Sequence, residues 1–161
     1  MSCNTEVYAE FCEKVRGTNI HEQTLLATDY LNHFNEVVML LEMLPDMPEC
    51  FEDISAWQPK SYQDHFRDSG FSDKDLAIAA YDHAPTRYRK PFDQTIAQTN
   101  DILLQAIARL GEALDGSDET ALRQIASQAS QRVQKLIERT SSIIHGSQHQ
   151  LDQSAIDDIL D

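Results

Sequence analysis

Apolar residues recur every three or four positions along most of this chain, which is the period of an amphipathic α-helix. Nowhere do apolar and polar residues alternate over the length of a strand. Proline or glycine stands at most points where the helical period breaks. The pattern therefore predicts an all-α fold, with helices over residues 5–16, 21–44, 48–56, 60–69, 72–83, 91–115 and 118–145.

The five prolines all lie in the middle part of the chain, between positions 45 and 91. The outer thirds can therefore hold long helices, whereas the middle third is expected to consist of short ones. We predict a helical bundle of about four main helices, built from the first helix and the three longest ones. Gly116 and Ser117 leave only a short connection, which favours antiparallel neighbours. The short helices would cover one end or one side.

Three apolar stripes are expected to form the core. In the helix 118–145 the stripe has heptad spacing, and its alanines allow a neighbour to approach closely, either within the monomer or from a second copy in a homodimer. The stripe of this helix is Leu122, Ala126, Ala129, Val133, Leu136, Thr140 and Ile143. The stripe of helix 91–115 is Phe92, Ile96, Leu103, Ile107, Leu110 and Leu114. The stripe of helix 21–44 is Leu26, Tyr30, Phe34, Val37, Leu41 and Leu44.

The charge is strongly negative, with 27 acidic against 13 basic side chains and a net charge of −14. This balance disfavours nucleic acid and anionic membrane surfaces as partners, and it favours cationic ones. No signal peptide is recognisable, and the longest apolar run, at 37–41, is far too short to span a bilayer. The three cysteines form no close pair, which is typical of reduced cytoplasmic thiols. We expect a cytoplasmic protein with a single helical domain over 1–146 and a flexible acidic tail over 147–161.

A basic cluster interrupts this acidic chain just before the predicted helix 91–115. It consists of Arg87, Arg89 and Lys90, with Tyr88 and His83 as further hydrogen-bonding side chains. One interpretation is an anion-binding site, because a helix N-terminus also attracts negative charge. The other, which we favour, is that the three cations pair with the protein's own carboxylates and hold a non-helical connection against acidic helices.

A row of potential metal ligands lies on the predicted helix 21–44. Asp29, His33 and Glu36 are spaced four and three apart, and His65 could join them from the middle third. Di-iron bundles use the order Glu-x-x-His on paired helices, whereas here the order is reversed and occurs once. We therefore favour hydrogen-bonded structural histidines and expect no cofactor.

Three methionines, Met39, Met43 and Met47, surround the end of the same predicted helix. They could line an adaptable binding surface, but filling of the core is the interpretation we favour. The chain has no glycine-rich phosphate loop and no nucleophile motif of the form G-x-S-x-G.

The last eleven residues, LDQSAIDDILD, resemble the short acidic peptides that bind chemotaxis receiver domains. Such peptides occur in the chemotaxis phosphatase CheZ and in the flagellar switch protein. The similarity lies in Gln153 and in the run Ile156, Asp157, Asp158, Ile159 and Leu160. It implies that the apolar residues of the tail lie in a groove of a receiver-type partner while the acids meet basic rims.

The CheZ family is a helical hairpin that hydrolyses phosphoaspartate with an Asp and a Gln four residues apart. Asp101 and Gln105 have this spacing and are expected to point away from the core stripe. The resemblance thus implies a response-regulator phosphatase or receiver-binding protein as one alternative, and a metal-binding bundle is a second. The function we favour is that of a non-enzymatic protein acting through protein–protein interaction, with the tail as its partner motif.

Overall fold

Helices dominate the part of the chain that the computed structural model describes, residues 2–146. In chain order the elements are α1 (Ser2–Lys14), η1 (Thr28–Leu31), α2 (Asn32–Met43), η2 (Pro48–Cys50), α3 (Phe51–Ala56), α4 (Tyr62–Asp68), α5 (Lys74–Tyr81), α6 (Thr86–Asp115) and α7 (Glu119–Ile144), where η marks a 3₁₀ helix. The one β-type pairing in these residues is an isolated bridge between Ile20 and Ala27. The predicted all-α fold is therefore confirmed. No helix within residues 2–146 has the length and hydrophobicity that a membrane span requires.

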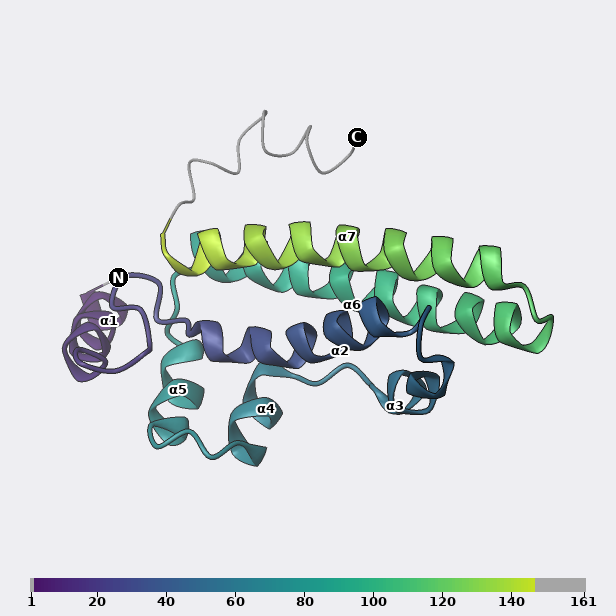
Figure 1. Ribbon diagram of the computed structural model, residues 1–161. Helices are drawn as coiled ribbons and strands as arrows, with labels where there is room; N and C mark the ends of the chain where they lie inside the picture. Colours follow the sequence, from purple (N-terminus) through teal and green to yellow (C-terminus); the bar gives the residue numbers. More distant parts are fainter. Residues whose placement is uncertain (1, 147–161) are drawn as a thin grey trace.

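The two longest helices, α6 and α7, form an antiparallel hairpin along the molecule (Figure 1). Gly116 and Ser117 make the turn, and the carboxylate of Asp118 accepts a hydrogen bond of 3.0 Å from the backbone N–H of Ala121, which caps α7. Every residue of the stripe predicted for α7 is buried. This heptad seam is therefore used within one chain, where α6 and α2 cover it.

The buried face of α6 is turned slightly from the predicted one. Ile96, Ile107 and Leu114 are only half-buried, whereas Thr95 and Thr99 are buried. Each threonine hydroxyl donates to the carbonyl oxygen four residues earlier in its own helix, at 2.7 Å in both cases. A hydroxyl satisfied in this way can enter an apolar core at little cost. Hydropathy alone did not predict that these two threonines are buried.

Helix α2 completes the core by packing on α7, and all six residues of its predicted stripe are buried. The predicted helix 21–44 is wrong over its first part, because η1 begins only at Thr28 and α2 at Asn32. Residues 21–27 form a local turn instead, in which the Leu25 N–H donates to the carbonyl of His21 at 2.8 Å, and they also bond to distant partners. The Thr24 hydroxyl donates to the carbonyl of Ile144 at 2.6 Å, and the N–H of Ala27 donates to the Tyr62 hydroxyl at 2.9 Å.

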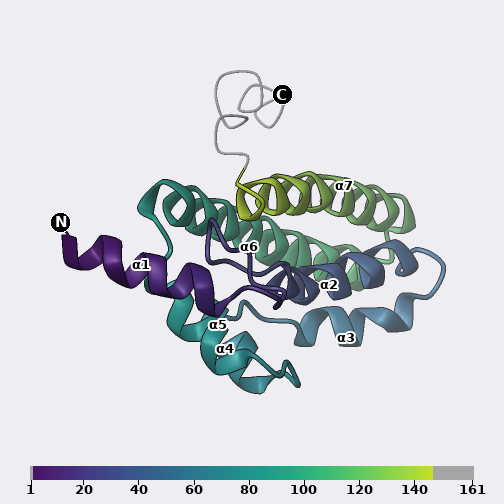
Figure 2. The same cartoon turned by 90° about the vertical axis from the view of Figure 1, so that its left-hand side faces the viewer.

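Helix α1 lies across one end of the long helices instead of alongside them (Figures 1 and 2). The expectation that it is a fourth bundle helix is therefore corrected. Tyr8 holds it there by donating a hydrogen bond of 2.6 Å to the carbonyl of Gln23, and the ring of Phe11 stacks on His83 with centroids 4.7 Å apart. The bundle proper consists of α2, α6 and α7, and α1 covers one end of it.

The short helices of the middle third lie beside α2, as expected (Figure 1). The start of α6, however, is five residues earlier than predicted, at Thr86, so Pro91 stands inside the helix. A proline there removes one N–H donor to the carbonyl of Arg87. Arg87 is exposed, so water can satisfy this carbonyl. As a result the basic cluster lies largely within the first turns of a helix instead of a loop.

Candidate functional site

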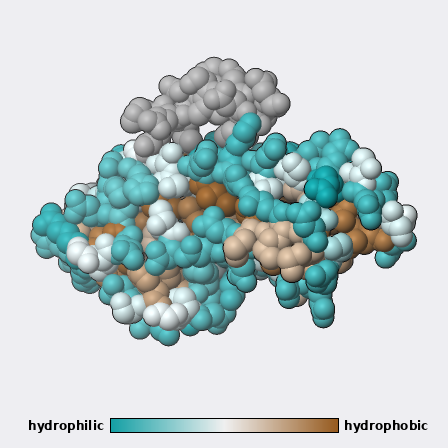
Figure 3. All heavy atoms as spheres, in the orientation of Figure 1, coloured by the Kyte–Doolittle hydropathy of each residue, from teal (hydrophilic) through white to brown (hydrophobic). Residues whose placement is uncertain are grey.

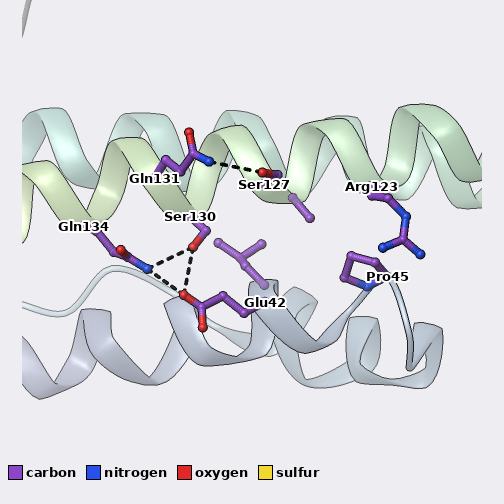
Figure 4. Close-up of a pocket in the computed structure, with 9 residues that line it drawn as sticks. Glu42, Pro45, Arg123, Ser127, Ser130, Gln131 and Gln134 are labelled. Carbon is purple, nitrogen blue, oxygen red and sulfur yellow. Dashed lines mark hydrogen bonds between the residues drawn. The ribbon is translucent and has the colours of Figure 1, made fainter.

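A groove runs along α7 beside the C-terminal end of α2. It consists of two adjoining hollows of about 500 Å³ and about 750 Å³, which share Pro45, Arg123 and Ser127 as lining residues. Figure 4 shows the first hollow, with α7 on one side and the end of α2 on the other. We call these two hollows the α2–α7 groove. Each hollow by itself is in the size range of sites that hold a small ligand.

The sequence explains why the groove is open. The flank of α7 that faces α2 carries small and amide side chains, which leave space between the two backbones; they are Ala126, Ser127, Ser130, Gln131 and Gln134. Helix α2 ends at Met43 and Pro45 follows, so the N-terminal half of α7 extends past its neighbour. The groove is therefore a consequence of unequal helix lengths and small residues.

A polar network fixes the wall of the first hollow (Figure 4). The Glu42 carboxylate accepts hydrogen bonds from the Gln134 side-chain amide at 2.6 Å and from the Ser130 hydroxyl at 3.3 Å. Arg123 lies 3.6 Å from the Asp46 carboxylate, and both of these side chains are exposed. Exposed pairs of this kind contribute little to stability, which leaves their charges available to a partner.

Met39, Met43 and Met47 are exposed on α2 and just beyond its end, and none of them is a lining residue of the α2–α7 groove. The exposed fractions of Met39, Met43 and Met47 are 57%, 38% and 42%. Figure 3 shows moderately hydrophobic surface over α2 within a largely hydrophilic face. The favoured interpretation, that these methionines fill the core, is therefore wrong, and an adaptable surface is what the chain presents.

The basic cluster does not meet carboxylates in the described part of the chain. The ion pairs found in residues 2–146 involve Arg16, Lys60, Arg67 and Arg123. Arg89 donates instead to the carbonyl oxygens of Tyr81 and Asp82, at 3.3 Å and 3.1 Å, and so satisfies the last turn of α5. Arg89 thus holds the end of α5 through backbone carbonyl oxygens, whereas we expected it to pair with carboxylates.

The other members of the cluster are also engaged in packing. The guanidinium of Arg87 lies 5.0 Å from the centroid of the Tyr88 ring, and the Tyr88 hydroxyl accepts a hydrogen bond of 2.6 Å from the Gln23 side chain. His83 stacks on α1. An external anion held by Arg87, Lys90 and their neighbours stays a prediction.

The predicted metal ligands do not assemble into a metal site. Within residues 2–146 no group of three or more His, Cys, Asp or Glu side chains is placed to hold a metal ion. The Nε2 atom of His33 lies 2.7 Å from the carbonyl oxygen of Gln58, and Glu36 is exposed. His65 lies near His33, with ring centroids 6.5 Å apart, and a backbone hydrogen bond links it to Asp29.

The histidines instead bind the middle third to α2. The His33 ring stacks on Trp57 at 4.9 Å, and the Trp57 indole N–H donates to the His33 carbonyl at 3.0 Å. Burial lowers the pKa of His33 and of His65 below the usual value, and the nearby His33 lowers that of His65 further. Both rings therefore favour the neutral form that a structural histidine needs.

Asp101 and Gln105 lie on the exposed side of α6, and Leu104 between them is 45% exposed. The spacing and exposure that the CheZ resemblance requires are thus present on this helix. The partner-binding residues of the tail, Ile156, Asp157, Asp158, Ile159 and Leu160, lie outside the described residues.

The sequence pattern did not predict the residues that form the walls of the groove. Glu42, Ser130 and Gln134 come from positions about 90 residues apart, with separations of 88 and 92. The available signal was the run of small and amide side chains along one flank of the predicted helix 118–145, where a solvent-facing helix more often carries charges. No family model, curated protein or solved structure matches this chain.

Proposed function

We propose that this protein acts by binding a helical segment of another protein in the α2–α7 groove. The observation that carries the proposal is the open groove itself, and Met39, Met43 and Met47, exposed on and just beyond the helix that walls it, add apolar surface outside its lining. Three large apolar side chains in solvent cost free energy unless a partner covers them. Methionine is suited to such a surface because its unbranched chain adapts to different apolar partners.

The partner's chemistry follows from the charges around the groove. The chain carries a net charge of −14, and Glu42 and Asp46 lie on the α2 side of the groove, with Arg123 as the basic residue of the lining. An amphipathic helix with an apolar face and basic flanks meets these requirements, since helix-in-groove binding needs anchors at helical spacing and complementary charge speeds encounter. The lack of a close cysteine pair supports a cytoplasmic setting.

The acidic tail supplies a second element of the same function. We retain the proposal that Ile156, Asp157, Asp158, Ile159 and Leu160 bind a receiver-type domain, on the strength of their resemblance to receiver-binding peptides. The tail and the groove both present acids, so each favours a basic surface on its partner.

A comparison of captured proteins tests the groove. We expect Met39→Ser with Met43→Ser to reduce capture of the groove partner about tenfold or more, which is the effect of losing apolar anchors at an interface. Quantitative mass spectrometry after pull-down measures it. The control is Leu104→Ser, which removes an exposed apolar side chain from α6.

Three proteins are compared with the wild type: the double methionine variant (the groove variant), the Leu104→Ser control and the chain lacking 147–161. Together they distinguish a groove partner from a tail partner. A protein lost only from the groove variant, and carrying a basic amphipathic helix, supports the proposal; one lost only on tail deletion is a tail partner. Equal capture by the wild type and the groove variant contradicts the groove proposal, and so does a groove partner that proves to be a second copy of this chain.

A CheZ-like phosphatase is the second candidate, favoured by the exposed Asp101 and Gln105 on one helix. We expect purified protein to accelerate loss of phosphate from a receiver domain loaded with acetyl phosphate, and Gln105→Ala to abolish the acceleration while the circular dichroism spectrum is unchanged. Gln98→Ala, an exposed glutamine two turns earlier, is the matched control. Equal activity of Gln105→Ala and wild type would remove this candidate.

A further inference from the structure

A second, smaller hollow lies away from the groove, where residues 59–63 pass between η1 and α6. Its volume is about 260 Å³. The lining residues that matter here are Tyr30, Tyr62, Tyr81, Phe92, Asp93 and Asn100. We call it the tyrosine hollow. None of the site residues predicted from the sequence lines it.

Aromatic rings form most of its wall. Tyr62 stacks on Tyr81 with centroids 4.8 Å apart, and Phe92 lies 5.8 Å from Tyr62 and 6.0 Å from Tyr30. The face of an aromatic ring carries partial negative charge and attracts cations. The wall thus favours a positively charged ligand over an anion.

Two tyrosine hydroxyls of the wall already donate hydrogen bonds. The Tyr30 hydroxyl donates to the Lys60 carbonyl, and the Tyr81 hydroxyl donates to one oxygen of Asp93, both at 2.5 Å. The Lys60 ammonium lies 2.9 Å from the Asp68 carboxylate. The hydroxyls of Tyr30 and Tyr81 are therefore not free to donate to a ligand.

Acceptors, in contrast, are available. Oδ1 of Asn100 is buried and has no hydrogen-bond partner in residues 2–146, a state that costs about 1–3 kcal/mol until a donor arrives. Asp93 is exposed, and a carboxylate can accept several hydrogen bonds beyond the one from Tyr81. Lys60, which also lines the hollow, pairs with Asp68 and not with Asp93, and no ion pair of Asp93 is found in residues 2–146.

The two acceptors lie in line along α6 with an apolar residue between them. Asp93 and Asn100 are seven residues apart, or about 10 Å along the helix axis, and therefore on the same face. Ile96, one turn from each, also lines the hollow. Two acceptors with an apolar contact between them match a short alkyl chain that carries a donor at each end.

We propose that the tyrosine hollow binds an elongated organic cation, with an ammonium group at Asp93, an alkyl chain on Ile96 and a second hydrogen-bond donor at Asn100. This site is separate from the proposed groove and does not depend on it. Its ligand class is that of linear amino alcohols and diamines of about five carbons, since longer chains exceed the spacing of the two acceptors.

The test is a titration of full-length, ¹⁵N-labelled protein, followed by backbone amide shifts at the hollow. The probes are 5-amino-1-pentanol, 1,5-diaminopentane, pentylamine and 1,5-pentanediol. We expect saturable shifts with the first two, about tenfold weaker binding of pentylamine, which lacks the second donor, and no saturation with the uncharged diol. Whichever of the first two binds more tightly identifies the second donor as hydroxyl or ammonium.

Variants separate the two acceptors. Asp93→Asn keeps an acceptor for Tyr81, so the fold is retained. It removes the charge, and we expect it to weaken the binding of 1,5-diaminopentane about tenfold. Asn100→Ala should make 5-amino-1-pentanol bind no better than pentylamine. Asp115→Asn, the same charge change at an exposed position of α6, controls for net charge. Equal binding of the diol and the amines, or an Asp93→Asn variant indistinguishable from Asp115→Asn, overturns the proposal.

Discussion

Buried polar side chains decide how the segments of this protein meet. Thr95, Thr99 and Thr140 each satisfy their hydroxyl on their own helix, so they pack as small, nearly apolar residues. Thr24 behaves differently, because its hydroxyl bonds the end of α7, which is 120 residues away. The hydropathy pattern treats all four alike. Residues 21–27 were predicted to be helical because Leu26 continues the apolar stripe of the predicted helix 21–44.

Individual histidines also make the stability of the fold depend on pH. Burial is the main cause that lowers the pKa of His21, His33 and His65 below the ordinary value of 6.5. A lowered pKa means that the unfolded chain binds the proton more readily, so the stabilisation is fully present above pH 6.5 and is lost as the pH falls through the folded-state pKa. We expect the melting temperature to decrease between about pH 7 and pH 5.5, above the range of most carboxylates.

A histidine variant checks the cause of this decrease. His65→Phe keeps an aromatic ring beside Tyr30 and Phe66 and removes one titrating group, so the decrease in melting temperature should become smaller. His83→Phe, at an exposed ring that stacks on Phe11, is the control and should follow the wild type. Parallel curves for all three proteins would show that other groups cause the effect.

At the scale of elements, glycine has opposite roles in two places. Gly111 lies inside α6, where a Cβ atom would meet the Phe51 ring at an ordinary contact distance of 3.4 Å. Gly17 ends the α1 region with φ of +81°, a backbone conformation that side chains disfavour. The same substitution should therefore have opposite effects at the two positions.

We predict that Gly111→Ala stabilises the protein by about 0.5–1 kcal/mol, because alanine restricts the unfolded chain and favours helix. Gly17→Ala should destabilise it by about 1 kcal/mol. Chemical denaturation with urea measures both. A destabilised Gly111→Ala protein would mean that the contact with the Phe51 ring is too close for the new methyl group.

At the scale of the whole molecule, three long helices share one core and the remaining elements cover its flank and one end (Figures 1 and 2). The core described over residues 2–146 includes every predicted stripe residue of α2 and α7. The groove and the tyrosine hollow both lie where a short element or a helix end leaves a long helix uncovered.

We predict that a chain ending at residue 146 keeps the melting temperature of the full-length protein within about 2 °C, since a change of 1 kcal/mol would shift it by several degrees. Differential scanning calorimetry of the two chains decides this. A truncated protein that melts much earlier would show that residues 147–161 belong to the main packing, and the tail would then no longer be a separate partner motif.

The sequence by itself determined the helical class, the positions of the long helices and most of their buried stripes, because the 3.6-residue period is local and the same residues must be buried in any packing. The exposure of Asp101 and Gln105 also follows from that period. Tertiary structure alone decided the rest. It placed α1 across the bundle end, kept residues 21–27 out of a helix and began α6 before Pro91, since bonds such as Gln23 to Tyr88 and Thr24 to Ile144 join residues 65 and 120 positions apart. Contacts at such separations leave no periodic trace in the chain, and the groove and the tyrosine hollow both depend on them.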